Sequence, residues 1–132
     1  MTVLPRSDES SQPYWDAAAR GHLLIQRCRA CSAHQFYPRP FCAKCLAPEP
    51  EWVEAAGTGR IHTFSVVHRT SDERFQADLP YVLAIVDLDE GVRMTTRIVG
   101  VPIDELRCEL PVRVVFESVA PGVALPHFTH AD

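Results

Sequence analysis

Apolar and polar residues alternate along the second half of the chain with the two-residue period of β-strands. Within residues 59–68, Ile61, Thr63, Ser65 and Val67 fall on one face, and the residues between them fall on the other. This alternation predicts a strand. Similar runs rich in β-branched residues predict three further strands, at 81–88, 92–99 and 112–119.

Turn signals between these runs indicate how the strands connect. Asp89-Glu90-Gly91 reads as a hairpin turn, which makes the strands on either side antiparallel neighbours. Residues 101–106 fit a short helical link before the last strand. Four or five strands of this size, with one helical link, predict a mainly β fold that ends in a five-stranded closed barrel of the OB type.

The residues from Ser11 to Gly21 carry the signals of one short helix. Ser11 can cap the helix, Pro13 suits its first turn and Gly21 can end it. Tyr14 and Trp15 lie on neighbouring helical positions and need a covering surface, because so short a helix is poorly stable alone. That surface belongs either to this chain or to another protein, so Tyr14 and Trp15 are candidate interface residues.

Four cysteines form two Cys-x-x-Cys pairs with ten residues between the pairs: Cys28 with Cys31, and Cys42 with Cys45. A tight turn within each pair aims both thiolates at one point, and two such turns complete a tetrahedron. All four positions are protein thiolates, so no position is left for water or substrate. The pattern therefore predicts one structural zinc ion and argues against zinc catalysis.

The segments that flank the cysteines, 22–27 and 36–41, both look extended, as the arms of a zinc ribbon do. The chain is long enough for one compact domain with a small appendage. We expect three parts: an N-terminal helical segment at 1–22, a zinc ribbon at 23–48 and an OB-fold at 49–132.

Disulfide bonds and redox chemistry are the alternative uses of the cysteine pairs. The chain starts with a polar stretch instead of an apolar signal segment, so we expect a reducing, cytoplasmic setting. A redox site needs a single Cys-x-x-Cys where a helix follows a strand. The fifth cysteine, Cys108, makes the count odd, and beside Leu106 and Leu110 it is expected to be a buried apolar side chain. No apolar run approaches the roughly 20 residues of a membrane span.

Charge and motif content narrow the functional classes. The net charge is −4 and Lys44 is the only lysine, so no basic stripe is available to neutralise phosphates along a nucleic acid. Nucleic-acid binding nevertheless remains the alternative function, because zinc ribbons and OB-folds often serve it. No catalytic motif is present: His62 and His68 have no visible acid or nucleophile beside them, and His127 and His130 are expected to be exposed in the tail.

Several stretches together resemble the zinc-ribbon/OB-fold family of acyl-CoA-associated proteins, over residues 14–128. The resemblance rests chiefly on Gln26 to Cys31, Phe36 to Cys45, Phe64 to Arg69, Asp87 to Arg93 and Leu125 to Phe128. It implies a rubredoxin-like ribbon, an OB-fold and a non-catalytic role in lipid or sterol metabolism. Such proteins accompany thiolase-fold enzymes, aldolases or hot-dog-fold enoyl-CoA hydratases, and their proposed ligand is acyl-CoA. The resemblance leaves open whether the chain forms a homodimer.

Coenzyme A presents phosphates and a flat adenine, so its site needs cationic forks beside an apolar shelf. The candidates are the cations and aromatic residues of the ribbon: Arg27, Arg29, Arg39, Lys44, Phe36 and Tyr37. The alternative is that these cations are solvated or pair locally. The chain departs from the family pattern at four positions: Ser32 and Leu46 where glycine is frequent after each cysteine pair, Arg97 in place of asparagine and Glu109 in place of glycine.

Overall fold

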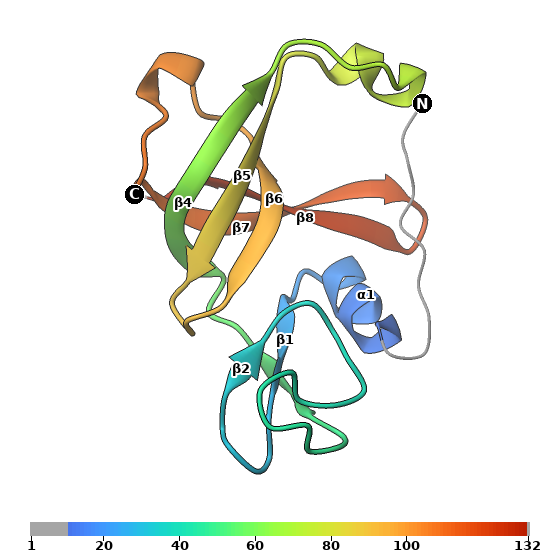
Figure 1. Ribbon diagram of the computed structural model, residues 1–132. Helices are drawn as coiled ribbons and strands as arrows, with labels where there is room; N and C mark the ends of the chain where they lie inside the picture. The colour runs from blue at the N-terminus through green and yellow to red at the C-terminus, as the bar shows by residue number, and fades with distance from the viewer. Residues whose placement is uncertain (1–10, 132) are drawn as a thin grey trace.

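The structure is a computed structural model, and it describes residues 11–131. A short helix and a small three-stranded sheet lie below a closed five-stranded barrel (Figure 1). The predicted fold class is confirmed: mainly β, with one N-terminal helix, a ribbon region and an OB-type barrel. The first ten residues of the predicted segment 1–22 lie outside the described residues. Within 11–131, no helix is long and apolar enough to cross a membrane.

Helix α1 (Gln12–Ala19) forms where the sequence predicts it, and it buries the side chains of Tyr14 and Ala18. Ser11 occupies the N-cap position, but its side chain makes no capping hydrogen bond, contrary to the prediction. Gly21 ends the helix with a φ of 82°, a left-handed conformation that glycine adopts without strain. In Figure 1, α1 lies between the ribbon and the hairpin formed by the last two strands.

The ribbon sheet has β1 (Leu24–Arg27) at its centre, paired antiparallel with β2 (His34–Gln35) and β3 (Glu51–Glu54). The predicted arm at 22–27 is therefore a strand. The arm at 36–41 is not: the chain bends after β2, and that segment makes only an isolated bridge. The sequence did not predict β3, because four residues are too few to display a period and their order comes from pairing with β1.

The barrel strands follow one another around the wall in the order β4, β5, β6, β8, β7. Their bounds are β4 Thr58–Val67, β5 Tyr81–Leu88, β6 Arg93–Ile98, β7 Pro111–Ala120 and β8 Val123–His130. Two short 3-10 helices, η1 (Glu73–Asp78) and η2 (Ile103–Glu105), link the strands; η2 is the predicted helical link. The core lies inside the barrel, where Ile61, Val86, Val112 and Phe128 are almost fully buried.

A register shift in β4 between Ile61 and Thr63 changes which residues face the core. The sequence placed Ile61, Thr63 and Ser65 on one face. Beyond the shift, however, Phe64 and Val66 pack against the core and Thr63 and Ser65 are exposed. A β-bulge adds one residue and so reverses the alternation beyond it, which a simple two-residue period cannot anticipate.

The last strand, β8, corrects two sequence-based expectations. The sequence treated 125–130 as a tail, yet these residues lie between β6 and β7 in the barrel. His127 is therefore buried, with 8% of its surface exposed, whereas His130 is exposed as predicted.

Cys108 was expected to be buried but is exposed in the turn between η2 and β7.

One junction of the barrel is short. β6 and β8 run parallel and share a single register pair, Ile98 with Phe128, supported by a hydrogen bond from Val99 N to Phe128 O at 2.8 Å. In contrast, β5 pairs with β6 over six positions. The edge of β6 that faces β8 therefore has no strand partner before Ile98. Parallel strands that meet at one point splay apart elsewhere, and here they leave a seam beside α1.

Candidate functional site

The four paired cysteines converge at the tip of the ribbon. The Sγ atoms of Cys28, Cys31, Cys42 and Cys45 all lie within 4.8 Å of one another. Sγ–Sγ distances are 3.5 Å between Cys28 and Cys45 and 3.7 Å between Cys31 and Cys42. Zinc–sulfur bonds of about 2.3 Å in a tetrahedron place neighbouring sulfurs roughly 3.8 Å apart. The donors thus fit one structural zinc ion, which would tie the two loops of the ribbon together.

Backbone amides stabilise the thiolate form of the buried cysteines. The N–H groups of Ala30 and Cys31 donate to Cys28 Sγ at 3.3 Å, and two amides of the second pair donate to Cys42 Sγ in the same way. The Cys31 amide contributes most to lowering the pKa of Cys28 to about 6. The backbone amides also lower the pKa of Cys42, so the first cysteine of each pair is held toward the thiolate form that binds a metal.

Ser32 and Leu46 follow the two cysteine pairs, where glycine is frequent in the family, and both adopt the left-handed conformation that glycine favours. Ser32 has a φ of 64° and Leu46 a φ of 67°. The cost of a left-handed conformation is roughly 1–2 kcal/mol for a residue with a side chain. Leu46 also exposes 70% of its surface, so an apolar side chain is presented to solvent from a strained backbone.

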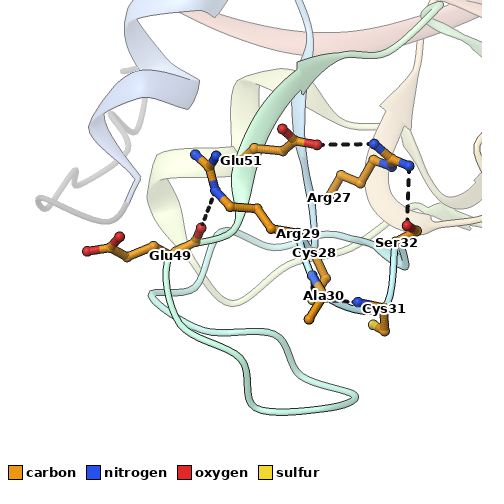
Figure 2. A network of polar contacts seen from close by, with 8 residues as sticks. All are labelled: Arg27, Cys28, Arg29, Ala30, Cys31, Ser32, Glu49 and Glu51. Atoms are coloured by element: carbon orange, nitrogen blue, oxygen red, sulfur yellow. Dashed lines mark hydrogen bonds and ion pairs between the residues drawn. The ribbon is translucent and has the colours of Figure 1, made fainter.

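Two of the ribbon arginines make local contacts (Figure 2). Arg27 forms an ion pair with Glu51 at 3.2 Å and donates to Ser32 Oγ at 3.3 Å. Arg29 Nε donates to the backbone oxygen of Glu49 at 3.0 Å. These contacts brace the first cysteine pair against β3 and the loop before it, which matches the expected alternative of local pairing.

The seam between β6 and β8 opens into a cleft of about 630 Å³, referred to below as the seam cleft. Its walls come from α1, the loop after β2, the outer part of β6 and the start of β8. The basic residues of its lining are Arg39, Arg93, Arg97 and His127; no carboxylate lines it among the described residues. The cleft therefore favours an anion.

One wall of the seam cleft is aromatic. Tyr14 contacts Trp15 edge-to-face, with ring centroids 4.8 Å apart, and contacts Phe36 at 5.5 Å. Phe36 in turn meets Tyr37 edge-to-face at 5.5 Å. Among these contacts none is a parallel stack, and Tyr37 exposes 44% of its surface. Burial raises the pKa of Tyr14, so its phenol stays protonated.

Two donors of the seam cleft lack partners. Trp15 Nε1 is buried and has no hydrogen-bond acceptor within residues 11–131. Leaving a buried donor unpaired costs about 1–3 kcal/mol. The Arg39 guanidinium likewise makes no ion pair or hydrogen bond with any described residue, although its backbone is anchored.

The opposite wall carries charged groups that are partly neutralised. Arg93 Nε donates to Asp87 at 2.7 Å. Arg97 pairs with Asp78 at 3.1 Å and lies over the Tyr81 ring, 4.1 Å from its centroid. Arg97 thus fastens the segment that contains η1 to the rim of the cleft. The departure from asparagine at position 97 supplies this contact.

His127 is the buried histidine of the lining. Its Nδ1 lies 3.2 Å from Glu117 Oε2, and its side chain is 10% exposed. Burial lowers the pKa of His127; among its charged neighbours, Glu117 and Asp78 oppose this shift and Arg97 reinforces it. The imidazole is therefore neutral at pH 7, and its placement follows from the pairing of β8 with β7.

The predicted ligand residues divide into two groups. Phe36, Tyr37 and Arg39 line the seam cleft, whereas Arg27, Arg29 and Lys44 lie at the cysteine loops and do not line it. Of the two candidate interface residues, Tyr14 is 3% exposed and belongs to the core, so its side chain is not presented to a partner. Trp15 is half-buried and packs against the same core.

Sequence reasoning missed three of the charged or titratable cleft residues: Arg93, Arg97 and His127. The two arginines alternate with Thr95 along β6, so the predicted strand at 92–99 contained a signal for a cationic outer face. No signal in the sequence shows that β8 ends beside that face.

Comparisons with known proteins agree with this architecture. Residues 15–51 match the family model described as "ChsH2, rubredoxin-like zinc ribbon domain", and residues 52–117 match "ChsH2, C-terminal OB-fold domain". A solved chain described as "Ltp2-ChsH2(DUF35) aldolase" superposes with a TM-score of 0.86 and 34% identity, covering 97% of this chain and 99% of that one.

Two curated relatives are similar in sequence. The "Probable enoyl-CoA hydratase alpha subunit" of Thermomonospora curvata is 35% identical over 127 residues, which is 96% of this chain but 39% of that protein. The "DUF35 domain-containing scaffold protein" of Methanocaldococcus jannaschii is 35% identical over 98 residues, covering 74% of this chain and 69% of the relative. The chain thus spans well under half of the hydratase subunit and about two thirds of the scaffold protein.

Proposed function

The chain belongs to the ChsH2 family of rubredoxin-like zinc ribbons with a C-terminal OB-fold, and from this premise we propose that it is a non-catalytic accessory subunit of an acyl-CoA enzyme. In this role it binds acyl-CoA and docks on a thiolase-like, aldolase or enoyl-CoA hydratase partner. The names of its relatives, a hydratase subunit and a scaffold protein, support an accessory role.

The observation that carries the proposal is the seam cleft. Its lining combines arginines with aromatic rings and contains no carboxylate among the described residues, as expected of a site for an anionic ligand with flat and apolar parts. A catalytic site needs a nucleophile, a base and an orienting group that converge. Within residues 11–131, the one buried histidine, His127, pairs with the carboxylate of Glu117 and forms no hydrogen bond with a serine, cysteine or other nucleophile.

For docking, the proposal assigns the exposed apolar side chains of the ribbon. Phe41 and Leu46, which do not line the seam cleft, expose 43% and 70% of their surfaces. The left-handed backbone of Leu46 serves the turn of the second cysteine pair, where Leu46 N donates to Cys42 O at 2.9 Å, but that hydrogen bond does not require an apolar side chain. A zinc-stabilised loop loses little freedom on binding, so apolar anchors there suit a protein partner.

Co-purification with a candidate thiolase-like, aldolase or enoyl-CoA hydratase partner tests the proposal. We expect Leu46→Ser to fold normally, hold zinc and lose the partner, whereas Ile103→Ser, which alters another exposed apolar residue (48% exposed) on η2, keeps it. Wild-type chain that never co-purifies, or that turns over acyl-CoA by itself, would refute an accessory role. Retention on single-stranded DNA at low salt would favour the nucleic-acid alternative.

A further inference from the structure

The lining of the seam cleft is suited to one part of the acyl-CoA molecule and not to the others. Acyl-CoA has an apolar acyl chain, a neutral pantetheine arm and a phosphorylated adenosine. The cleft offers cationic and aromatic groups together, with Arg39 and Tyr37 on one loop and Arg93 and Arg97 across from them. We propose that the seam cleft is a nucleotide site, which receives a planar base and its phosphates.

The aromatic wall is suited to hold a base. Tyr14, Trp15, Phe36 and Tyr37 meet edge-to-face or tilted, and none of these pairs forms a parallel stack. The half-exposed Tyr37 ring lines the cleft and is available to stack. The Trp15 indole lines the same wall beside it.

The cations are suited to hold phosphates. Arg39 has a guanidinium with no partner among the described residues, and Arg93 uses only its Nε on Asp87, so its terminal amino groups remain available. An arginine fork binds phosphate oxygens in pairs. A neutral pantetheine arm or an aliphatic chain would leave Arg39 without counter-charge, whereas Arg93 and Arg97 already pair with Asp87 and Asp78. The nucleotide end is therefore assigned to the cleft.

This inference rests on the proposed function for its ligand, but it is tested on the isolated chain, so the two can fail separately. Co-purification measures whether the partner is bound, whereas ligand binding to the isolated chain measures whether the nucleotide site exists. Two sources share the chemistry: the nucleotide end of CoA and a free adenine nucleotide.

Trp15 supplies the readout. The chain has two tryptophans, so Trp52→Phe leaves Trp15 as the sole indole fluorophore. We expect adenosine 3′,5′-bisphosphate to change Trp15 fluorescence saturably, and calorimetry on the wild-type chain to give the same affinity. Pantetheine should not bind. Affinity for CoA well above that for ADP would identify CoA as the source, and equal affinities would identify free nucleotides.

Matched variants complete the test. Arg39→Gln should weaken bisphosphate binding roughly tenfold or more, given the strength of charge-assisted hydrogen bonds to phosphate. Arg113→Gln, an exposed arginine on β7 outside the cleft, should leave binding unchanged. The proposal is overturned if bisphosphate does not bind, if pantetheine binds equally well, or if Arg39→Gln and Arg113→Gln bind alike while both remain folded.

Discussion

The buried side-chain amide of Gln26 makes two hydrogen bonds with the backbone of Arg39. Gln26 Nε2 donates to Arg39 O at 2.9 Å, and Arg39 N donates to Gln26 Oε1 at 2.8 Å. The amide thus imitates a neighbouring strand and fixes the loop that carries Arg39 to β1. Gln35 Nε2 also donates to Gln26 Oε1, at 2.7 Å. The position of Arg39 at the seam cleft depends on a residue that does not line it.

Replacing Gln26 should therefore affect both stability and the cleft. Gln26→Leu keeps the approximate volume but leaves two backbone groups of Arg39 without partners, which should cost about 1–3 kcal/mol in the free energy of unfolding. Urea denaturation measures the change. Gln76→Leu is the control, because Gln76 is exposed and its hydrogen bond to Thr70 O is solvated. Equal losses in both variants would contradict the role given to Gln26.

Zinc removal should unfold the ribbon. Freshly purified protein is expected to hold one zinc per chain, measured by elemental analysis. Cys31→Ala should lose the metal and much of the stability, because metal binding is coupled to folding. Cys108→Ala should retain both, since Cys108 is exposed and lies outside the cluster. A full equivalent of zinc in Cys31→Ala would exclude that residue as a ligand.

His127 should make stability depend on pH. Burial lowers its pKa below the usual 6.5, so the unfolded chain binds a proton at a higher pH than the folded chain. The stabilising contribution is complete above about pH 6.5 and is lost as the pH falls through the lower, folded value. Denaturation at pH 7.5 and 5.5 should show a larger acid-side loss for wild type than for His127→Gln. Parallel losses would rule out His127 as the source.

Arg97 should control the mobility of the η1 segment. Arg97→Ala removes the ion pair with Asp78 and the contact with the Tyr81 ring. The expected cost is about 1 kcal/mol, with faster amide exchange across 72–80. Arg74→Ala removes a more exposed pair with Asp72 and should change stability little. Unchanged exchange in Arg97→Ala would show that other contacts hold the segment.

The parts of the fold that the sequence predicted are those with local signals. The cysteine spacing located the ribbon, the period of two located β4 to β7, and the turn at 89–91 located a hairpin. The sequence did not predict β8 for a physical reason. Pro126 and His127 interrupt its apolar pattern, and its burial comes from the strands on both sides and from α1. The prediction that Cys108 is buried was wrong because it relied on apolar neighbours in the sequence, and these do not cover the side chain in the fold.

The candidate site was predictable only in part, because it is made by a junction. The loop residues Phe36, Tyr37 and Arg39 stood out by composition. Their counterparts on β6 and β8 became visible only once the single pair of Ile98 and Phe128 showed where two strands diverge. A two-residue period of apolar residues predicts neither the bulge in β4 nor the number of residues that pair between β6 and β8.

The loop at 36–41 begins after one cysteine pair and ends at the other, so the metal ion closes the ring of chain that carries Tyr37 and Arg39. The two binding equilibria are therefore linked and must be reciprocal: whatever factor zinc adds to ligand affinity, the ligand adds to zinc affinity. If the proposed nucleotide binds here, a chelator would need a higher concentration to remove zinc from the occupied protein. Removal of zinc would in turn weaken nucleotide binding, while the barrel strands, which contain none of the four cysteines, would keep their pairing.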